Sequence, residues 1–276
     1  MLGISFDWAG VLTGEPAQWL LTGILTTAYV TLAASLLASI LAVLVLGLRI
    51  SPARAGRWPA VAIIELFRNT PLIVQLMFWY FAAFGLLPLS WRLWIGNDHA
   101  WARLPGGIGL ISPEFLAATW GLGLFSAVFI AEEMRAGLLA VPAGQREAAL
   151  SQGLGPWAIL RHVLLPQALR NAFQPVVGQY LNLMKLSSLA TAIGLGEITY
   201  QVRQIESYNS HALEAFAVGT VLYLIFGLVL AQVLSRFEPA RIPQRRSAAT
   251  PAHAVAFAIL EAAKGIDGSQ GADRGA

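Results

Sequence analysis

Residue types that carry out enzyme chemistry are sparse in this chain. Its 276 residues include no cysteine, which excludes disulfides, thiolate metal sites and a cysteine nucleophile. Neither lysine, Lys185 or Lys264, lies in a glycine-rich phosphate-binding loop, so we expect no ATP-hydrolysing site of that kind. The four histidines are scattered and form no His-Glu-x-x-His pair; they are His99, His162, His211 and His253. We therefore expect no catalytic site, no metal site and no cofactor.

The composition indicates that lipid surrounds much of the chain. Hydrophobic residues make up 57% of the sequence and charged residues only 12%. Soluble proteins average about 45–50% apolar and about 25% charged residues. The N-terminus from Met1 to Asp7 has no basic residue, which a cleaved secretory signal usually has. We therefore interpret the first hydrophobic segment as a retained membrane span, and we expect membrane lipid and not nucleic acid around the chain.

Gaps between charged residues show where membrane helices of roughly 20 residues can lie. The first span is predicted at 20–48, the third between Glu114 and Glu132, and the fifth between Glu214 and Arg236. The second occupies the gap from Arg68 to Arg92, with an apolar run that begins near Pro59. The fourth, 172–195, is interrupted by Lys185, so its prediction depends on the loop charges and not on hydropathy.

Basic residues accumulate after the first, third and fifth spans. They are Arg49, Arg54, Arg57, Arg135, Arg146, Arg161, Arg170, Arg236, Arg241, Arg245 and Arg246; the other two loops hold only Arg92, Arg103 and Arg203. Cytoplasmic loops are enriched in arginine and lysine. Five spans, with a periplasmic N-terminus and a cytoplasmic C-terminus, satisfy this rule at every loop. The predicted fold is an all-α integral membrane protein with a periplasmic segment (1–19), a transmembrane domain (20–240) and a cytoplasmic tail (241–276).

The loop between spans three and four, from Val141 to Pro166, is long and patterned. Pro142 favours the start of a helix. Gly153 favours its end, because glycine readily adopts a left-handed backbone conformation. Gly155 and Pro156 then predict a second, amphipathic helix, which we expect Pro166 to end. Two short helices should therefore lie across the cytoplasmic face.

Small and charged residues on the first of these helices suit a contact with another surface. Ala148 and Ala149 give a smooth face, and Arg146 and Glu147 place charges at its edge. One interpretation is a helix that docks into a groove of a partner protein. The other is a helix that lies on lipid headgroups. The physical properties of the residues leave both open.

Lys185 is the most unusual residue inside a predicted span. A basic side chain at the bilayer centre costs about 2.5–3.5 kcal/mol on insertion scales, so Lys185 should face protein or a water-filled cavity. It could help a translocation path to tolerate a substrate carboxylate or gate that path. Alternatively, it could bond a carbonyl or an acid, or reach the membrane surface. Ser187 and Ser188 lie beside it, and such hydroxyls serve more often in bonds between helices than as ligands.

Glu65 and Arg68 are three residues apart and share a helical face, so they are expected to pair. They could form a polar wall of the path near the cytoplasmic side. The alternative is a self-satisfied pair at the membrane boundary, followed by a helix break at Pro71.

The sequence Glu147-Ala-Ala149, with Gly153 and then Leu165-Pro166 beyond it, resembles the EAA loop of binding-protein-dependent ABC transporter permeases. The family pattern is Glu-Ala-Ala-x-x-x-Gly followed by Ile-x-Leu-Pro, and Val163 stands here at the Ile position. The resemblance implies the type I importer fold, with this loop as the coupling helix that docks on a cytoplasmic ATPase. It assigns ATPase coupling to Arg146, Glu147, Ala148, Ala149, Gly153, Leu165 and Pro166.

Other stretches resemble the polar amino-acid branch of that family. They are Glu65-Leu-Phe-Arg-Asn-Thr-Pro-Leu-Ile-Val-Gln-Leu76, Lys185-Leu-Ser-Ser-Leu-Ala190 and Ser207-Tyr-Asn-Ser-His-Ala-Leu-Glu-Ala-Phe216. The family usually has an acidic or amide residue after the lysine, so Leu186 departs from its pattern. The likeness to glutamate/aspartate importer permeases implies that the substrate is glutamate, aspartate or another polar amino acid. The candidate residues of the substrate path are the polar side chains within the spans, Glu65, Arg68, Lys185, Ser187 and Ser188.

The resemblance spans about Trp19 to Arg241 and implies a location in the bacterial inner (plasma) membrane. It also implies three protein partners: a cytoplasmic ATP-binding subunit, a periplasmic amino-acid-binding protein and a homologous permease, in a heterodimer rather than a homodimer.

Two other functional classes remain as alternatives. An ion-driven secondary carrier or channel often shows paired repeats with broken helices, but the halves of this chain show no convincing repeat, and the loop from Glu147 to Pro166 would have no purpose. A membrane-embedded hydrolase would need clustered His, Asp or Ser residues, and none is evident.

Overall fold

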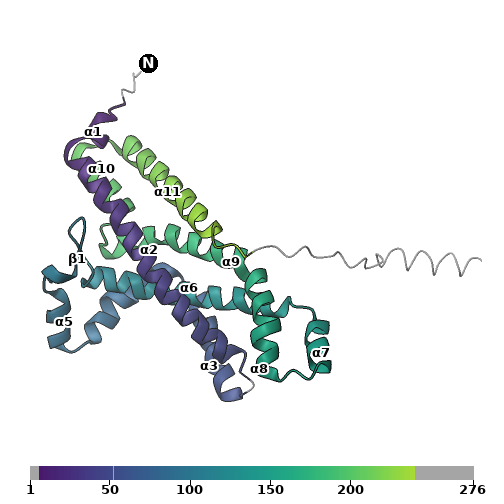
Figure 1. Cartoon of the computed structure of the whole chain (residues 1–276). Helices are drawn as coiled ribbons and strands as arrows, with labels where there is room; N and C mark the ends of the chain where they lie inside the picture. The colour runs from purple at the N-terminus through teal and green to yellow at the C-terminus, as the bar shows by residue number, and fades with distance from the viewer. Residues whose placement is uncertain (1–5, 52, 240–276) are drawn as a thin grey trace, which may run out of the picture. The chain divides into compact units, whose positions relative to one another are not determined.

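The computed structural model describes residues 6–51 and 53–239, which are almost entirely helical (Figure 1). The predicted tail 241–276 and the first five residues lie outside the described residues. In chain order the elements are α1 (Ala9–Leu12), α2 (Gly14–Arg49), α3 (Arg54–Arg68), α4 (Leu72–Met77), η1 (Phe78–Ala83), η2 (Phe84–Leu86), α5 (Leu89–Gly96), η3 (Ala100–Ala102), β1 (Arg103–Leu104), β2 (Ile108–Gly109), α6 (Pro113–Leu139), α7 (Ala143–Ser151), α8 (Pro156–Ile159), η4 (Leu160–Leu164), α9 (Leu165–Leu186), η5 (Ser187–Ile193), α10 (Ile198–Asn209) and α11 (Ala212–Ser235). Of the η segments, η1 and η4 are π-helical and the others are 3₁₀ turns.

Three described helices are long and apolar enough to cross a membrane: α2, α6 and α11. They match the first, third and fifth predicted spans. A fourth candidate is the pair of α3 and the segment Leu72–Leu86, which is bent by 103° at a short break. Helix α9 does not pass this test by composition, as the interruption at Lys185 predicts. The described residues therefore contain three such helices, or four if the bent pair is one span.

The long helices α2 and α6 run in the same direction, and α9 runs in the opposite direction. A Cβ atom on Gly123 of α6 would lie 2.8 Å from Leu37 of α2. Further along both helices, Arg49 Nε lies 3.7 Å from Glu132 Oε1, so α2 and α6 run parallel. Helix α9 runs antiparallel to α6. It begins beside the C-terminal end of α6, and its later residue Gln179 lies next to the earlier α6 residue Glu133, with 3.4 Å between Nε2 and Oε1.

Small residues allow the close approach of α2 to its neighbours. Ala34, Ala38 and Ala42 repeat at every fourth position of α2 and are completely buried. They join the main core cluster, together with Ala118 and Leu122 of α6. Helices in lipid gain stability mainly from such close packing of small faces. Most of α11 exposes large apolar side chains instead, as a lipid-facing helix does.

A glutamine stabilises the bend between α3 and α4. Helix α3 ends at Arg68, and Pro71 precedes α4 in an extended conformation, which confirms the predicted helix break. Gln75 is buried, and its Nε2 donates to the carbonyls of Phe67 and Thr70, each at 3.0 Å. These two bonds satisfy backbone acceptors that the interrupted helix leaves free.

Candidate functional site

The predicted helix between spans three and four is present as α7, and glycine ends it. Gly153 has a φ of +78°, the left-handed conformation that its sequence position predicts. Gly153 N donates to the Leu150 carbonyl at 2.9 Å, and Leu154 N donates to the Ala149 carbonyl at 3.2 Å. This pair of bonds is the Schellman motif. A Cβ on Gly153 would meet no atom within 4 Å, so only backbone strain opposes a substitution there.

The surface of α7 is almost completely free. Arg146, Glu147 and Ala148 are exposed, and no hydrogen bond or ion pair engages the side chains of Arg146 and Glu147 within residues 6–51 and 53–239. Ala149 is the exception, because only 5% of it is exposed. The helix packs on η4, so Ala149 faces its own chain. The smooth outer face predicted for two alanines is therefore formed by Ala148 alone.

The second predicted short helix does not end at Pro166, and that prediction is wrong. Helix α8 begins at Pro156, as predicted, but continues through the π-helical segment η4 directly into α9. Pro166 lies in the first turn of α9. The π-helical segment η4 lies just before Pro166, and its wider turn accommodates a residue that lacks an amide donor and whose ring would clash in a regular α-helix. Leu165 is 43% exposed and stands beside it.

The base of the loop is clamped where α6 meets α9. A Cβ on Gly137 would lie 2.7 Å from the Ala168 carbonyl oxygen and 2.7 Å from the Ala172 Cβ. The side chain of Asn171 adds a bond, because its Nδ2 donates to the Gly137 carbonyl at 3.2 Å. Sequence reasoning missed this contact. The only signal was a glycine near the end of a long apolar helix.

An ion triad joins α2 to α6 just before the loop. Arg135 binds Glu132 through two nitrogens, with Nη2 at 2.8 Å from Oε2 and Nε at 3.2 Å from Oε1. Arg49 approaches the same carboxylate at 3.7 Å. Sequence reasoning counted these arginines only as loop charges. The spacing of Glu132 and Arg135 was the signal that could have found the pair.

Glu65 and Arg68 do not pair, contrary to the prediction. The Glu65 carboxylate accepts from Asn69 Nδ2 at 2.8 Å, and the same amide also bonds the Glu65 carbonyl. The Arg68 guanidinium lies 5.6 Å from the centre of the Phe129 ring. Asn69 follows the last helical residue and reaches Glu65 at a four-residue spacing, so it takes the place expected for Arg68. Both charged side chains are exposed.

Lys185 is exposed, and its ammonium has no hydrogen bond or ion pair in the described part of the chain. In the chain, Lys185 lies between Gln179, which contacts Glu133 near the end of α6, and Gly194, which lies beside Glu114 at the start of α6. Lys185 is therefore placed about midway along α6. Ser187 and Ser188 donate to the carbonyls of Met184 and Lys185, at 2.7 and 2.8 Å. These two bonds lie within their own helical segment.

The single subunit does not bring the predicted path residues together. Within residues 6–51 and 53–239, no hydrogen bond or ion pair links Lys185 to Glu65 or Arg68. The described residues also contain no group of three or more His, Asp or Glu side chains that could hold a metal ion.

Glu197 is a buried acid that sequence reasoning missed. It lies in the turn between η5 and α10, outside the helices long enough to span, and is completely buried. Its carboxylate accepts from the backbone N–H groups of Thr199 and Tyr200 at 3.0 and 2.9 Å, and from the Tyr223 hydroxyl. Burial raises the pKa of Glu197, and these hydrogen bonds oppose the rise. Glu197 thus caps α10 and ties it to α11.

Comparisons with known proteins agree with this arrangement. Residues 34–242 match the family described as "Binding-protein-dependent transport system inner membrane component". The chain is 33% identical to the glutamate/aspartate import permease protein GltJ of Escherichia coli K12 over 86% of its own length and 95% of the relative. It is 35% identical to the glutamine transport system permease protein GlnP of the same strain, over 85% and 97%.

A solved amino acid ABC transporter with histidines has the same fold. Its chain superposes with a TM-score of 0.70 at 26% identity, over 85% of this chain and 99% of that one. The family works with an ATP-binding subunit and a substrate-binding protein, and its members contain no ATPase of their own. The chain therefore belongs to the family of binding-protein-dependent transport system inner membrane components, the permease subunits of bacterial ABC importers.

Proposed function

We propose that this permease carries glutamate, aspartate or another polar amino acid, and that a separate ATPase drives it by docking on α7. The free surface of α7 carries this proposal. Arg146, Glu147 and Ala148 point away from the chain. The C-terminal end of the helix is fixed by the Schellman motif at Gly153. A short capped helix with unpaired charges and a small residue on its outer face suits a groove in another protein. Leu165 and Pro166, which we also assign to ATPase coupling, lie at the start of α9.

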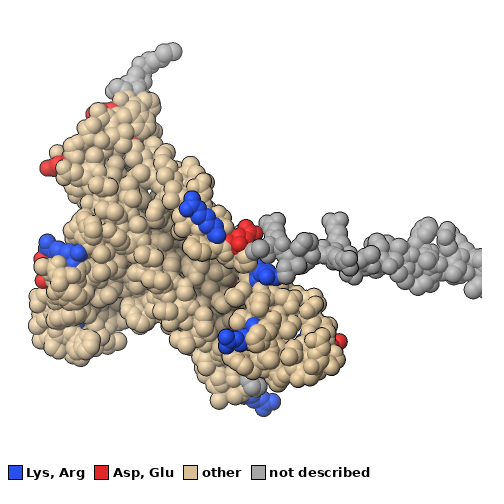
Figure 2. Space-filling view, in the orientation of Figure 1, with Lys and Arg blue, Asp and Glu red and all other residues tan. Residues whose placement is uncertain are grey.

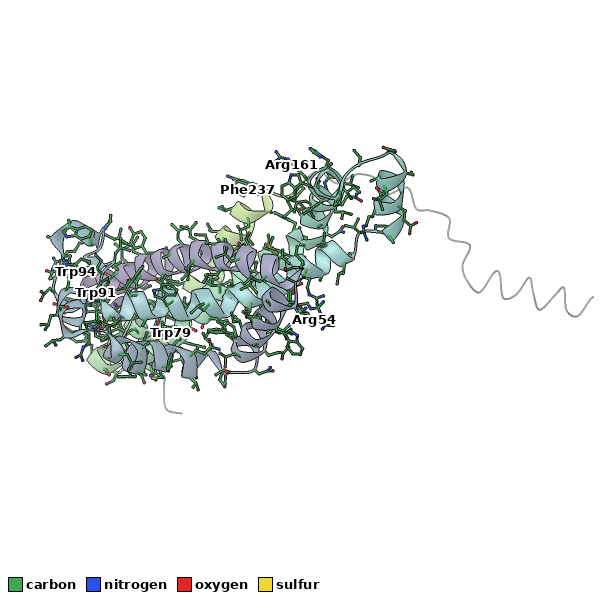
Figure 3. All side chains as sticks on the ribbon, turned by 90° about the horizontal axis from the view of Figure 1, so that it is seen from below. Arg54, Trp79, Trp91, Trp94, Arg161 and Phe237 are labelled. Atoms are coloured by element: carbon green, nitrogen blue, oxygen red, sulfur yellow. The ribbon has the colours of Figure 1, made fainter. Side chains whose placement is uncertain are left out.

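The proposed topology has five spans, a periplasmic N-terminus and a cytoplasmic C-terminus. The path of α9 and η5 supports the fourth span. Helix α9 begins beside Gly137 near the end of α6, and the residue after η5 lies beside Glu114 in the first turn of α6. This path therefore covers the length of α6 in the opposite direction. Arg54 and Arg161 lie at one end of the bundle (Figure 3), which fits a cytoplasmic face. The corresponding domains are 1–19, 20–240 and 241–276.

Lys185 supports a translocation path at the edge of this subunit. An exposed and unpaired ammonium midway along a span is costly against lipid. A water-filled path between two permeases would remove that cost, and it would place the charge where a substrate carboxylate passes. Ser187 and Ser188 lie next to it, and we place Glu65 and Arg68 nearer the cytoplasmic side. The second wall of the path would come from a homologous permease, in a heterodimer.

The test is uptake into liposomes that contain the complex with its ATPase inside and the amino-acid-binding protein outside. Gly153→Asp forces a Cβ onto a left-handed backbone position, so we expect ATP-dependent uptake to fall strongly. Gly153→Asn is the matched control, because asparagine tolerates this conformation far better, and it should retain most uptake. Uptake that proceeds without ATP, or an ATPase that never binds the wild-type chain, would instead favour an ion-driven carrier.

A further inference from the structure

The segment between the bent pair and α6 exposes an unusual set of large apolar side chains. They belong to α5 and the turn before it, and each is between 48% and 82% exposed; they are Leu86, Leu89, Trp91, Leu93 and Trp94. We call this set the α5 face. Soluble surfaces rarely expose so many large apolar residues within one short segment, and such a group marks contact with a partner or a membrane.

The α5 face lies beside the ends of membrane helices. Only Leu87 and Pro88 separate η2 from α5, so α5 begins within roughly 10 Å of the end of the bent pair. On its other side, Ile95 lines a cleft of about 240 Å³ with Pro113 and Leu116 at the start of α6. Helix α5 is therefore held at the level where these helices end and does not project away from them.

The figures place this face at one end of the bundle. Trp91 and Trp94 lie at the end opposite Arg54 and Arg161 (Figure 3). Charged side chains occupy only separated spots on the visible surface, and most of that surface is uncharged (Figure 2). The largely uncharged bundle therefore has two exposed tryptophans at the end where α6 begins (Figure 3).

Arg92 adds a cationic group to the same helix. Its side chain is only partly exposed, and its Nε is buried without a hydrogen-bond partner in the described part of the chain. The nearby acid Asp98 is already engaged, because its Oδ1 accepts from Arg103 Nε at 2.9 Å. A partly exposed guanidinium that lacks a protein acid suits the phosphate of a phospholipid, which accepts bidentate bonds from arginine.

We propose that α5 lies in the lipid–water boundary of the leaflet at which α6 begins. Trp91, Leu93 and Trp94 enter the zone between headgroups and acyl chains, and Arg92 bonds a lipid phosphate. Tryptophan concentrates at this depth because its ring is apolar and its N–H needs a polar partner. In the proposed topology this leaflet is the periplasmic one. A lipid explains the aromatic residues, the unpaired arginine and the level of the helix together.

The absence of native cysteine makes a direct depth measurement possible. The full chain would carry a spin label at Leu93→Cys in vesicles of phosphatidylethanolamine and phosphatidylglycerol. Collisions with oxygen, which enriches in lipid, are compared with collisions with a water-soluble nickel chelate. Two reference sites are Leu224→Cys on the exposed apolar side of α11 and Ala143→Cys on α7.

We expect the label at Leu93→Cys to collide mainly with oxygen, as at Leu224→Cys and unlike Ala143→Cys. Arg92→Glu should raise its nickel collisions several-fold, because a carboxylate repels the phosphate. Arg103→Gln, which removes a guanidinium already bound to Asp98, should leave them unchanged. Nickel collisions equal to those at Ala143→Cys would overturn the proposal. So would a label shielded from both reagents, because protein rather than lipid would then cover the face.

Discussion

Gly137 of α6 and Ala168 of α9 touch so closely that a Cβ on Gly137 would lie 2.7 Å from the Ala168 carbonyl oxygen. Both residues flank the loop that contains α7, one before it and one after it. The loop therefore leaves the bundle from a fixed base. Under the proposed coupling role, a movement imposed on α7 would reach two packed helices rather than be absorbed by a flexible joint.

Gly137→Ala should separate α6 from α9. Overpacking of a tight contact costs about 1–3 kcal/mol, and the backbone oxygen of Ala168 has little freedom to move. We expect a lower thermal unfolding midpoint in detergent and a lower ratio of uptake to ATP hydrolysis.

The control for this variant is Gly47→Ala in α2, where a Cβ meets no atom within 4 Å. Alanine should there be neutral or slightly stabilising, because it favours a helix over glycine by about 1 kcal/mol. Equal midpoints for the two variants would show that the contact at Gly137 is not tight.

Gln75→Leu should weaken the bend between α3 and α4. It removes the two donors to the carbonyls of Phe67 and Thr70 and leaves those acceptors without their partner, at a cost of about 1–3 kcal/mol. The unfolding midpoint should fall. Gln232→Leu, on an exposed position of α11, is the control and should leave it nearly unchanged. A bend held by Pro71 alone would make the two variants alike.

Glu197→Leu should destabilise the contact between α10 and α11 at every pH. It removes the acceptor of two backbone N–H groups and of the Tyr223 hydroxyl. Loss of a helix cap costs about 0.5–2 kcal/mol, and the buried hydroxyl adds to this loss. Glu197→Gln keeps an acceptor oxygen and should be affected much less. Identical midpoints for both variants would contradict the capping role.

The same residue predicts a pH dependence. Because burial raises the pKa of Glu197 above its ordinary value of 4.5, the folded state prefers the protonated form. Its contribution to stability is thus complete below pH 4.5 and is lost as the pH rises through the raised pKa. The wild-type midpoint should fall over that range relative to Glu197→Gln, measured by thermal unfolding at a series of pH values. A constant difference between them would contradict the raised pKa.

Local sequence patterns predicted the parts of this fold that depend on neighbouring residues. Charge-free runs located α2, α6 and α11, and Gly153 identified the end of α7. Hydropathy alone could not find α9, because Lys185 and several amide side chains interrupt its apolar residues.

The wrong predictions concern choices between local partners. Pro166 was expected to stop a helix, yet the chain stays helical on both sides of it, as the π-helical segment η4 before it and as α9 after it. Arg68 was expected to bind Glu65, but Asn69 reaches that carboxylate first. Ala149 was assigned to the outer face, because the sequence alone does not show which side of α7 rests on η4.

The missed residues depend on contacts between distant parts of the chain. Gly137 meets Ala168 across the whole loop, and Glu197 meets Tyr223 across α10. A single sequence contains no signal for the partner of a glycine or of a buried acid. Their importance appears only after the helices have been packed.

Photo-crosslinking from α7 tests the central claim most directly, because it separates docking on an ATPase from contact with lipid. A benzophenone label on Ala148→Cys, which is unique in a cysteine-free chain, would be activated in membranes that contain the complex. The same label on Ser90→Cys in α5 is the control. We predict a crosslink between the chain and the ATPase subunit from Ala148→Cys and none from Ser90→Cys. Crosslinks from Ala148→Cys to lipid alone, with the ATPase present and active, would contradict the account.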